Sequence, residues 1–96
     1  MLVVGVCQVI LSIDGNTSLK GKRSVVRRVI DRTRQKFNVA MAEVDDNDAH
    51  EHAVLGFTVV GNERAFVNSS LDKILDFIDS ASDAPIAHHD YEIISY

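Results

Sequence analysis

Hydrophobic and polar residues follow each other along the chain in patterns that predict four strands and two helices. The first pattern covers residues 2–13, which are rich in β-branched and apolar types and contain no proline, as is typical of a β-strand. Apolar side chains fall on both faces of this strand, which favours a central place in the sheet. The residues of one face are Val3, Cys7, Val9, Leu11 and Ile13, and those of the other are Leu2, Val4, Val6 and Ile10.

The spacing of apolar residues becomes helical between residues 19 and 37. A polar turn over residues 14–18 precedes this helix, and Ser18 is the expected N-cap. Asn38 is expected to end the helix in the left-handed conformation that Gly and Asn tolerate. The apolar stripe repeats at the i, i+3, i+4, i+7 spacing of an amphipathic helix, and it consists of Val26, Val29, Ile30, Thr33 and Phe37.

The second half of the chain predicts a hairpin, a second helix and a last strand. Residues 39–45 and 53–60 are the hairpin strands, joined by a polar loop over residues 46–51. Gly61-Asn62 precedes the second helix, with Asn62 as the expected cap, and a loop over residues 80–83 followed by Pro85 leads to a strand over residues 91–96. The inner face of this helix is expected to present Val67, Leu71, Ile74, Leu75 and Ile78.

The resulting order, β-α-β-β-α-β, predicts an α+β fold of the ferredoxin-like type, formed by residues 1–96 as a single domain. We expect a four-stranded antiparallel sheet, with the first and third strands central and both helices on one face. The other face would expose an apolar patch, and such patches usually mark interaction surfaces. A homodimer closed across this face or across an edge strand is therefore expected. The patch would consist of Val4, Val6, Ile10, Val54 and Val60.

One segment resembles a known family. Ser18-Leu19-Lys20-Gly21-Lys22-Arg23 matches the S-L-K-x-K-R signature of the YlxP-like proteins, a small bacterial family of unknown function. The family's pattern continues over essentially the whole chain. The resemblance implies a ferredoxin-like fold that is often dimeric, and a gene that tends to lie beside genes for transcription-elongation and translation-initiation or ribosome-binding factors; it implies no known reaction. The further matching residues are Arg32, Phe37-Asn38-Val39, 42–45, Asp48 and 53–56.

Charge is distributed very unevenly. The chain has a net charge of −4, but residues 20–36 hold eight of the ten Lys and Arg residues and one acid, Asp31. Clustered Lys and Arg bind phosphates by releasing counterions and, for Arg, by bidentate hydrogen bonds. The sequence therefore predicts an RNA- or anion-binding face, although a solvated helix face paired with acids from elsewhere would carry the same residues. The predicted nucleic-acid or anion contacts are Lys20, Lys22, Arg23, Arg27, Arg28 and Arg34.

The acidic loop that joins the hairpin strands contains a second group of polar side chains. Carboxylates and imidazoles at this density are metal-ligand types, and a solvated turn is the competing interpretation. The spacing does not match a calcium-binding EF-hand loop. The candidate metal ligands are Asp45, Asp48, His50 and His52.

The single cysteine, the N-terminal segment and the absence of a catalytic motif limit the possible classes of function. Cys7 is the sole cysteine, and we expect an unreactive core thiol in a reducing compartment. The chain starts directly with a strand and has no signal-peptide pattern or membrane-length apolar run, so a cytoplasmic protein without a membrane partner is expected. We find no catalytic arrangement of side chains and expect no cofactor, so an enzyme is the less favoured class.

These observations together predict a non-catalytic module that associates with RNA or a ribonucleoprotein, in a transcription, translation or ribosome-assembly context, through its basic first helix. Sequence-specific DNA binding is not expected. Two alternatives remain open. One is a protein-interaction or regulatory dimer that acts through the open sheet face, and the other is a metal-dependent activity at the 45–52 loop.

Overall fold

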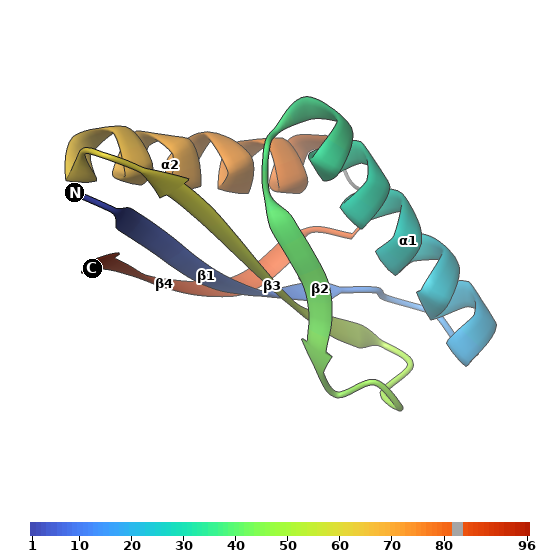
Figure 1. Ribbon diagram of the computed structural model, residues 1–96. Coiled ribbons are helices and arrows are strands. Elements are labelled where there is room, and N and C mark those ends of the chain that lie inside the picture. The colour runs from blue at the N-terminus through green and yellow to red at the C-terminus, as the bar shows by residue number, and fades with distance from the viewer. Residues whose placement is uncertain (82–83) are drawn as a thin grey trace.

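The computed structural model describes residues 1–81 and 84–96 of the protein. Within them the predicted α+β order is confirmed: β1 (Val3–Ser12), α1 (Leu19–Lys36), β2 (Ala40–Asp45), β3 (His52–Gly61), α2 (Arg64–Ala81) and β4 (Ile86–Ser95). The strands form one antiparallel sheet in the order β2-β3-β1-β4, so β1 and β3 are central as expected. Both helices cover the same face of this sheet, and the other face is open (Figure 1).

The core lies between the helices and the covered face of the sheet. The alternation of β1 places Val3, Cys7, Val9 and Leu11 there, each no more than 1% exposed. Burying an apolar side chain of this size stabilises the fold by roughly 1.5–3 kcal/mol. The inner faces predicted for the two helices are confirmed; their buried residues are Val26, Val29, Thr33, Val67, Leu71, Ile74, Leu75 and Ile78.

The last strand is longer than its sequence pattern predicted. β4 begins at Ile86 and pairs with β1 over nearly its whole length, so His88 and His89 lie in a strand and not in a loop. β4 is an edge strand whose side chains are mostly exposed. Because neither of its faces is fully buried, the strand carries no hydrophobic alternation that would have revealed it.

The ends of both helices also differ in detail. α2 includes Ser80 and Ala81, which were expected in a loop, and the other two residues of that predicted loop, 82 and 83, lie outside the described residues. α2 begins at Arg64, so Asn62 is not its cap. α1 ends at Phe37, whose backbone is extended (φ −128°) and whose N–H donates to the Thr33 carbonyl at 2.8 Å. Asn38 is not left-handed, since Asp46 is the one non-glycine residue with a positive φ among residues 1–81 and 84–96; the chain passes directly from the helix toward β2.

The open sheet face is apolar, with one correction to its predicted composition. Val6 and Val60 are 40% and 58% exposed, as expected. Val54 is only 3% exposed; it lies on a central strand, paired with Ile10 of β1 on one side and with Asp45 of β2 on the other. No helix within residues 1–81 and 84–96 has the length and apolarity needed to cross a membrane.

Candidate functional site

The basic helix α1 starts from a tightly bonded turn. The Ser18 side chain accepts a hydrogen bond from the Gly21 N–H at 3.0 Å, which confirms Ser18 as the N-cap. The Asn16 amide donates to the Ser18 carbonyl at 2.8 Å and to the His50 carbonyl of the hairpin loop. Asn16 approaches the helix at Gly21. A Cβ at this position would overlap with the Asn16 side-chain oxygen, so a glycine is needed here. This turn joins α1 to the loop between β2 and β3.

Lys22 does not lie on the exposed basic face, which corrects its predicted role in phosphate binding. Its side chain is 1% exposed, and its Nζ donates to the Asp46 carbonyl at 2.6 Å and lies 2.9 Å from Oε2 of Glu43. The reason is its position one turn before Val26 on the buried stripe, where side chains turn toward the sheet. An ammonium buried there has no access to a ligand in solvent, and its charge is balanced by Glu43.

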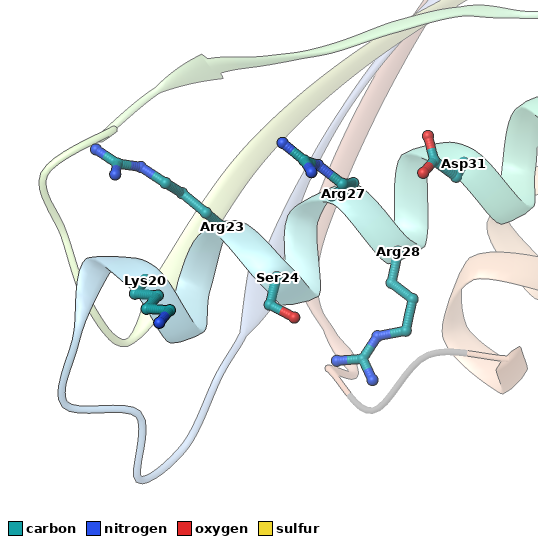
Figure 2. Close-up of a pocket in the computed structure, with 6 residues that line it drawn as sticks. All are labelled: Lys20, Arg23, Ser24, Arg27, Arg28 and Asp31. Atoms are coloured by element: carbon teal, nitrogen blue, oxygen red, sulfur yellow. The ribbon is translucent and has the colours of Figure 1, made fainter.

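The exposed cations of the first half of α1 surround one surface depression of about 460 Å³ (Figure 2). Arg23 and Arg27 extend in the same direction from neighbouring turns, and Arg28 extends from the other side of the helix. Within residues 1–81 and 84–96, no carboxylate forms an ion pair with Lys20, Arg23 or Arg27. We call this surface the basic depression; its lining residues are Lys20, Arg23, Ser24, Arg27, Arg28 and Asp31.

Not every predicted contact contributes equally to this surface. Arg28 lines the basic depression but also interacts with another group of the protein. Arg34 is exposed but lies two turns beyond Arg27, roughly 10 Å further along the helix. Lys36 lies over the ring of Phe77, with its Nζ 5.0 Å from the centroid, and so contributes to packing between the helices. Lys20, Arg23 and Arg27 are therefore the cations best placed for a ligand.

Two backbone N–H groups of the first turn of α1 are already used within the protein. A helix N-terminus binds an anion through backbone N–H groups that have no other acceptor. The Gly21 N–H donates to the Ser18 hydroxyl and the Lys22 N–H to the Ser18 carbonyl. The Gly21 and Lys22 N–H groups are therefore not available to an anion.

The acidic hairpin loop does not assemble the predicted metal ligands. Among residues 1–81 and 84–96, no three His, Cys, Asp or Glu side chains are grouped closely enough to hold a metal ion. His52 pairs instead with the Asp46 carboxylate, at 2.9 Å between Nε2 and Oδ2. Asp46 has a positive φ of 51°, which places it at the tight turn after β2. Asp45, Asp48 and His50 thus do not join His52 in one ligand cluster.

Cys7 is a core thiol, as expected. Its residue is 1% exposed, and burial, with a smaller contribution from the charge of Asp90, raises the pKa of the thiol to about 11. A thiol with this pKa is protonated at neutral pH, and the protonated form is a poor nucleophile.

Two functional relationships were not evident from the sequence. Glu43 balances the charge of Lys22, and the Asp46 carbonyl accepts a hydrogen bond from it, although these residues lie more than twenty positions further along the chain. Two sequence patterns indicate that these side chains face the core. The helical spacing extends the buried stripe of α1 back to Lys22, and the alternation of β2 places Glu43 on the same face as Met41. Neither signal identifies the partner without the hairpin's position.

Comparisons with known proteins agree with this fold and name no reaction. A family model described as "Protein of unknown function (DUF503)" matches residues 4–91. The "Uncharacterized protein YlxP" of Bacillus subtilis (strain 168) is 36% identical over 63 residues, which cover 66% of this chain and 68% of that one. The solution NMR structure of a de novo designed protein with a ferredoxin fold aligns with a TM-score of 0.57 at 19% identity, covering 100% of this chain and 88% of the other.

Proposed function

The chain belongs to the DUF503 family of proteins of unknown function, and we propose that it is a non-catalytic module that binds RNA, free or within a ribonucleoprotein, through the basic depression of α1. The observation that carries the proposal is the grouping of Lys20, Arg23 and Arg27 around one depression with no carboxylate partner among the described residues. Unpaired cations on one surface attract a polyanion because its bound counterions are released.

The placement of charge over the whole molecule supports the same surface. All ten Lys and Arg residues lie in α1 and α2, and none lies in a strand. The open sheet face, which some RNA-binding domains use with stacking aromatic residues, carries Asp90 and Glu92 on its edge strand. Carboxylates repel phosphates, so RNA is expected on the helix layer.

The type of contact follows from the side chains of α1. The helix contains no aromatic residue, so it offers no platform for stacking an unpaired base. Lys and Arg side chains on successive turns can instead follow successive phosphates of a structured RNA. We therefore expect contacts to the RNA backbone, with little dependence on base sequence.

Salt dependence tests this mode of binding. If three phosphates are contacted, the affinity should fall roughly 20- to 40-fold between about 50 and about 200 mM salt. The measurement is fluorescence anisotropy with a labelled RNA hairpin, and with a labelled single-stranded RNA of equal length for comparison. Affinity that is independent of salt would exclude phosphate contacts as its source.

A matched pair of charge reversals tests the location. K20E changes a cation of the basic depression, and K73E makes the same change on the exposed surface of α2. K20E should weaken RNA binding roughly tenfold, since a hydrogen bond to a charged group is worth about 1.5–3 kcal/mol and this one is exposed to solvent. R23E/R27E should weaken it further. Equal losses in K20E and K73E would show a non-specific charge effect and would contradict the proposed site.

A further inference from the structure

The sheet face that the helices leave uncovered contains a hollow of about 440 Å³. The Val44 side chain packs over Gly56, where a Cβ would lie only 3.0 Å from Cγ1 of Val44, so the hollow lies beside Val44 and not directly above Gly56. Val6 and Val44 border the hollow and are 40% and 51% exposed, so apolar surface is available to a ligand here. The lining side chains on this face are Val6, Gln8, Ala40, Ala42, Val44 and Thr58, arranged around Gly56.

Two carboxylates border the same face. Asp90 and Glu92 of β4 are the register partners of Gln8 and Val6 of β1, and the side chains of directly opposite residues lie on the same face of a sheet. Both acids are exposed, and neither forms an ion pair within residues 1–81 and 84–96. Because no strand of the sheet contains Lys or Arg, nothing on the strands neutralises them. The open face is therefore an apolar hollow with an acidic border.

We propose that this face binds a cationic segment of a partner protein, which places one bulky apolar side chain in the hollow between Val6 and Val44 and directs a Lys or Arg toward Asp90 and Glu92. Both parts of the surface are used: the apolar residue covers exposed valine surface, and the cation meets carboxylates that lack a counter-charge. This site is on the opposite layer from the basic depression and does not depend on RNA binding.

The geometry sets the spacing in the segment. Gly56 is on β3 and the carboxylates are on β4, two strand positions away, which is roughly 10 Å at the usual separation of strands. An extended peptide advances about 3.3 Å per residue. The cation should therefore follow or precede the apolar residue by two or three positions.

Charge complementarity distinguishes this partner from the other occupants. An open face of a second copy would bring the same carboxylates and no Lys or Arg from its strands. RNA would bring phosphates against Asp90 and Glu92. A cationic peptide alone supplies both the apolar group and the charge that this face lacks.

The first experiment selects peptides with the protein itself. A random library of short peptides displayed on phage is panned on the immobilised full chain. The expected result is enrichment of an aromatic or large aliphatic residue two or three positions from Lys or Arg. Absence of enrichment, or enrichment of acidic or purely polar peptides, would overturn the proposal.

Variants then locate the selected peptide. D90N/E92Q should reduce its affinity at least about tenfold, as expected for losing charged contacts, and should abolish the preference for Lys and Arg. The matched control D72N/D76N removes two exposed carboxylates from α2 and should leave affinity unchanged. G56A, whose new Cβ would displace the Val44 side chain that borders the hollow, should weaken peptides with the bulkiest apolar residue most. Equal effects of D90N/E92Q and D72N/D76N would contradict the site, as would NMR shifts on α1 instead of at Val6 and Thr58.

A second copy is excluded or established by sedimentation. The wild-type chain and V6E, which places a charge beside the hollow, are compared by analytical ultracentrifugation at the concentrations used for peptide binding. We expect the wild type and V6E to have the same mass, since a homodimer joined through an edge strand would not be affected by V6E. A wild-type dimer that V6E dissociates would show that a second copy occupies the face, and the peptide proposal would then be wrong.

Discussion

Lys22 shows how one residue can belong to the core although its neighbours in sequence are solvent-exposed cations. Its ammonium lies between the Asp46 carbonyl and the Glu43 carboxylate, and so connects α1 to β2 and to the start of the hairpin loop. The contact with Glu43 is an ion pair without hydrogen-bond geometry, because Oε2 has no hydrogen-bond partner. Its contribution is therefore mainly the balance of charge in a buried place.

Replacing Lys22 by methionine should destabilise the protein by about 2–3 kcal/mol. Breaking a buried pair typically costs about 3–5 kcal/mol, and Glu43 is 18% exposed, so water relieves part of the loss. Urea denaturation measures the change. K22M/E43L, which replaces both charges with apolar groups, should recover most of the stability. Folded K22M should bind RNA with the affinity of the wild type. If K22M lost RNA affinity without losing stability, Lys22 would have to contact the RNA, which would contradict its buried role.

Cys7 should make the stability depend on alkaline pH. The unfolded thiol ionises near pH 9.0 and the folded one near pH 11, so at pH 10 the unfolded chain binds fewer protons than the native protein. Stability from this group is therefore present below pH 9 and decreases as pH rises from about 9 to about 11. Unfolding free energies of wild type and C7A at pH 8 and pH 10.5 test this. Parallel changes in both proteins would mean that Cys7 is not responsible.

At the scale of elements, the start of α1 is held by contacts that oppose a normal helix preference. Replacing glycine by alanine inside a helix usually stabilises it by about 0.5–1 kcal/mol. G21A should instead destabilise this protein, since the new Cβ would overlap with the Asn16 side chain. Thermal unfolding measures the sign.

The second half of this test removes the obstacle. In an N16A background, where Ser18 Oγ at 3.2 Å is the nearest remaining side-chain atom, G21A should lose most of its destabilising effect. A destabilisation of equal size in both backgrounds would show that Asn16 is not the cause. The cycle also measures how strongly Asn16 joins the helix start to the His50 carbonyl.

Over the whole molecule, charge is separated between parts of the chain. Residues 20–36 carry a net charge of +7 and the remainder −11, although the total is only −4. The cations lie on the helix layer, and the exposed acids of β4 lie on the open face. Such a charge distribution favours anionic partners at the helix layer and cationic partners at the open sheet face.

This separation predicts unusual behaviour on ion exchangers. At neutral pH and low salt, the wild-type protein should bind both an anion exchanger, as its net charge requires, and a phosphate-bearing cation exchanger through α1. R23E/R27E should lose retention on the cation exchanger and keep it on the other. K73E should keep both. Wild-type protein that flows through the phosphate resin would argue against an accessible basic depression.

Much of the fold was predictable because its signals are local. The helical stripe of α1, the inner face of α2, the two-sided apolar pattern of β1 and the Ser18 cap are set by residues a few positions apart. The predicted boundaries of elements were wrong where the sequence pattern is weak. The first half of β4 was missed because this edge strand carries mostly exposed side chains, and the Ser80-Ala81 end of α2 was assigned to a loop because of its composition.

The sequence by itself determined the order of elements, the core side chains and the concentration of cations on α1, because periodicity and charge are properties of a single element. Only the tertiary structure decided which of those cations remain exposed. Lys22 is withdrawn because the hairpin brings Glu43 and Asp46 beneath the helix, whereas Arg23 and Arg27 remain at the surface. Which residues contact each other across the molecule depends on how segments distant in sequence pack together. A local sequence pattern contains no information about this packing.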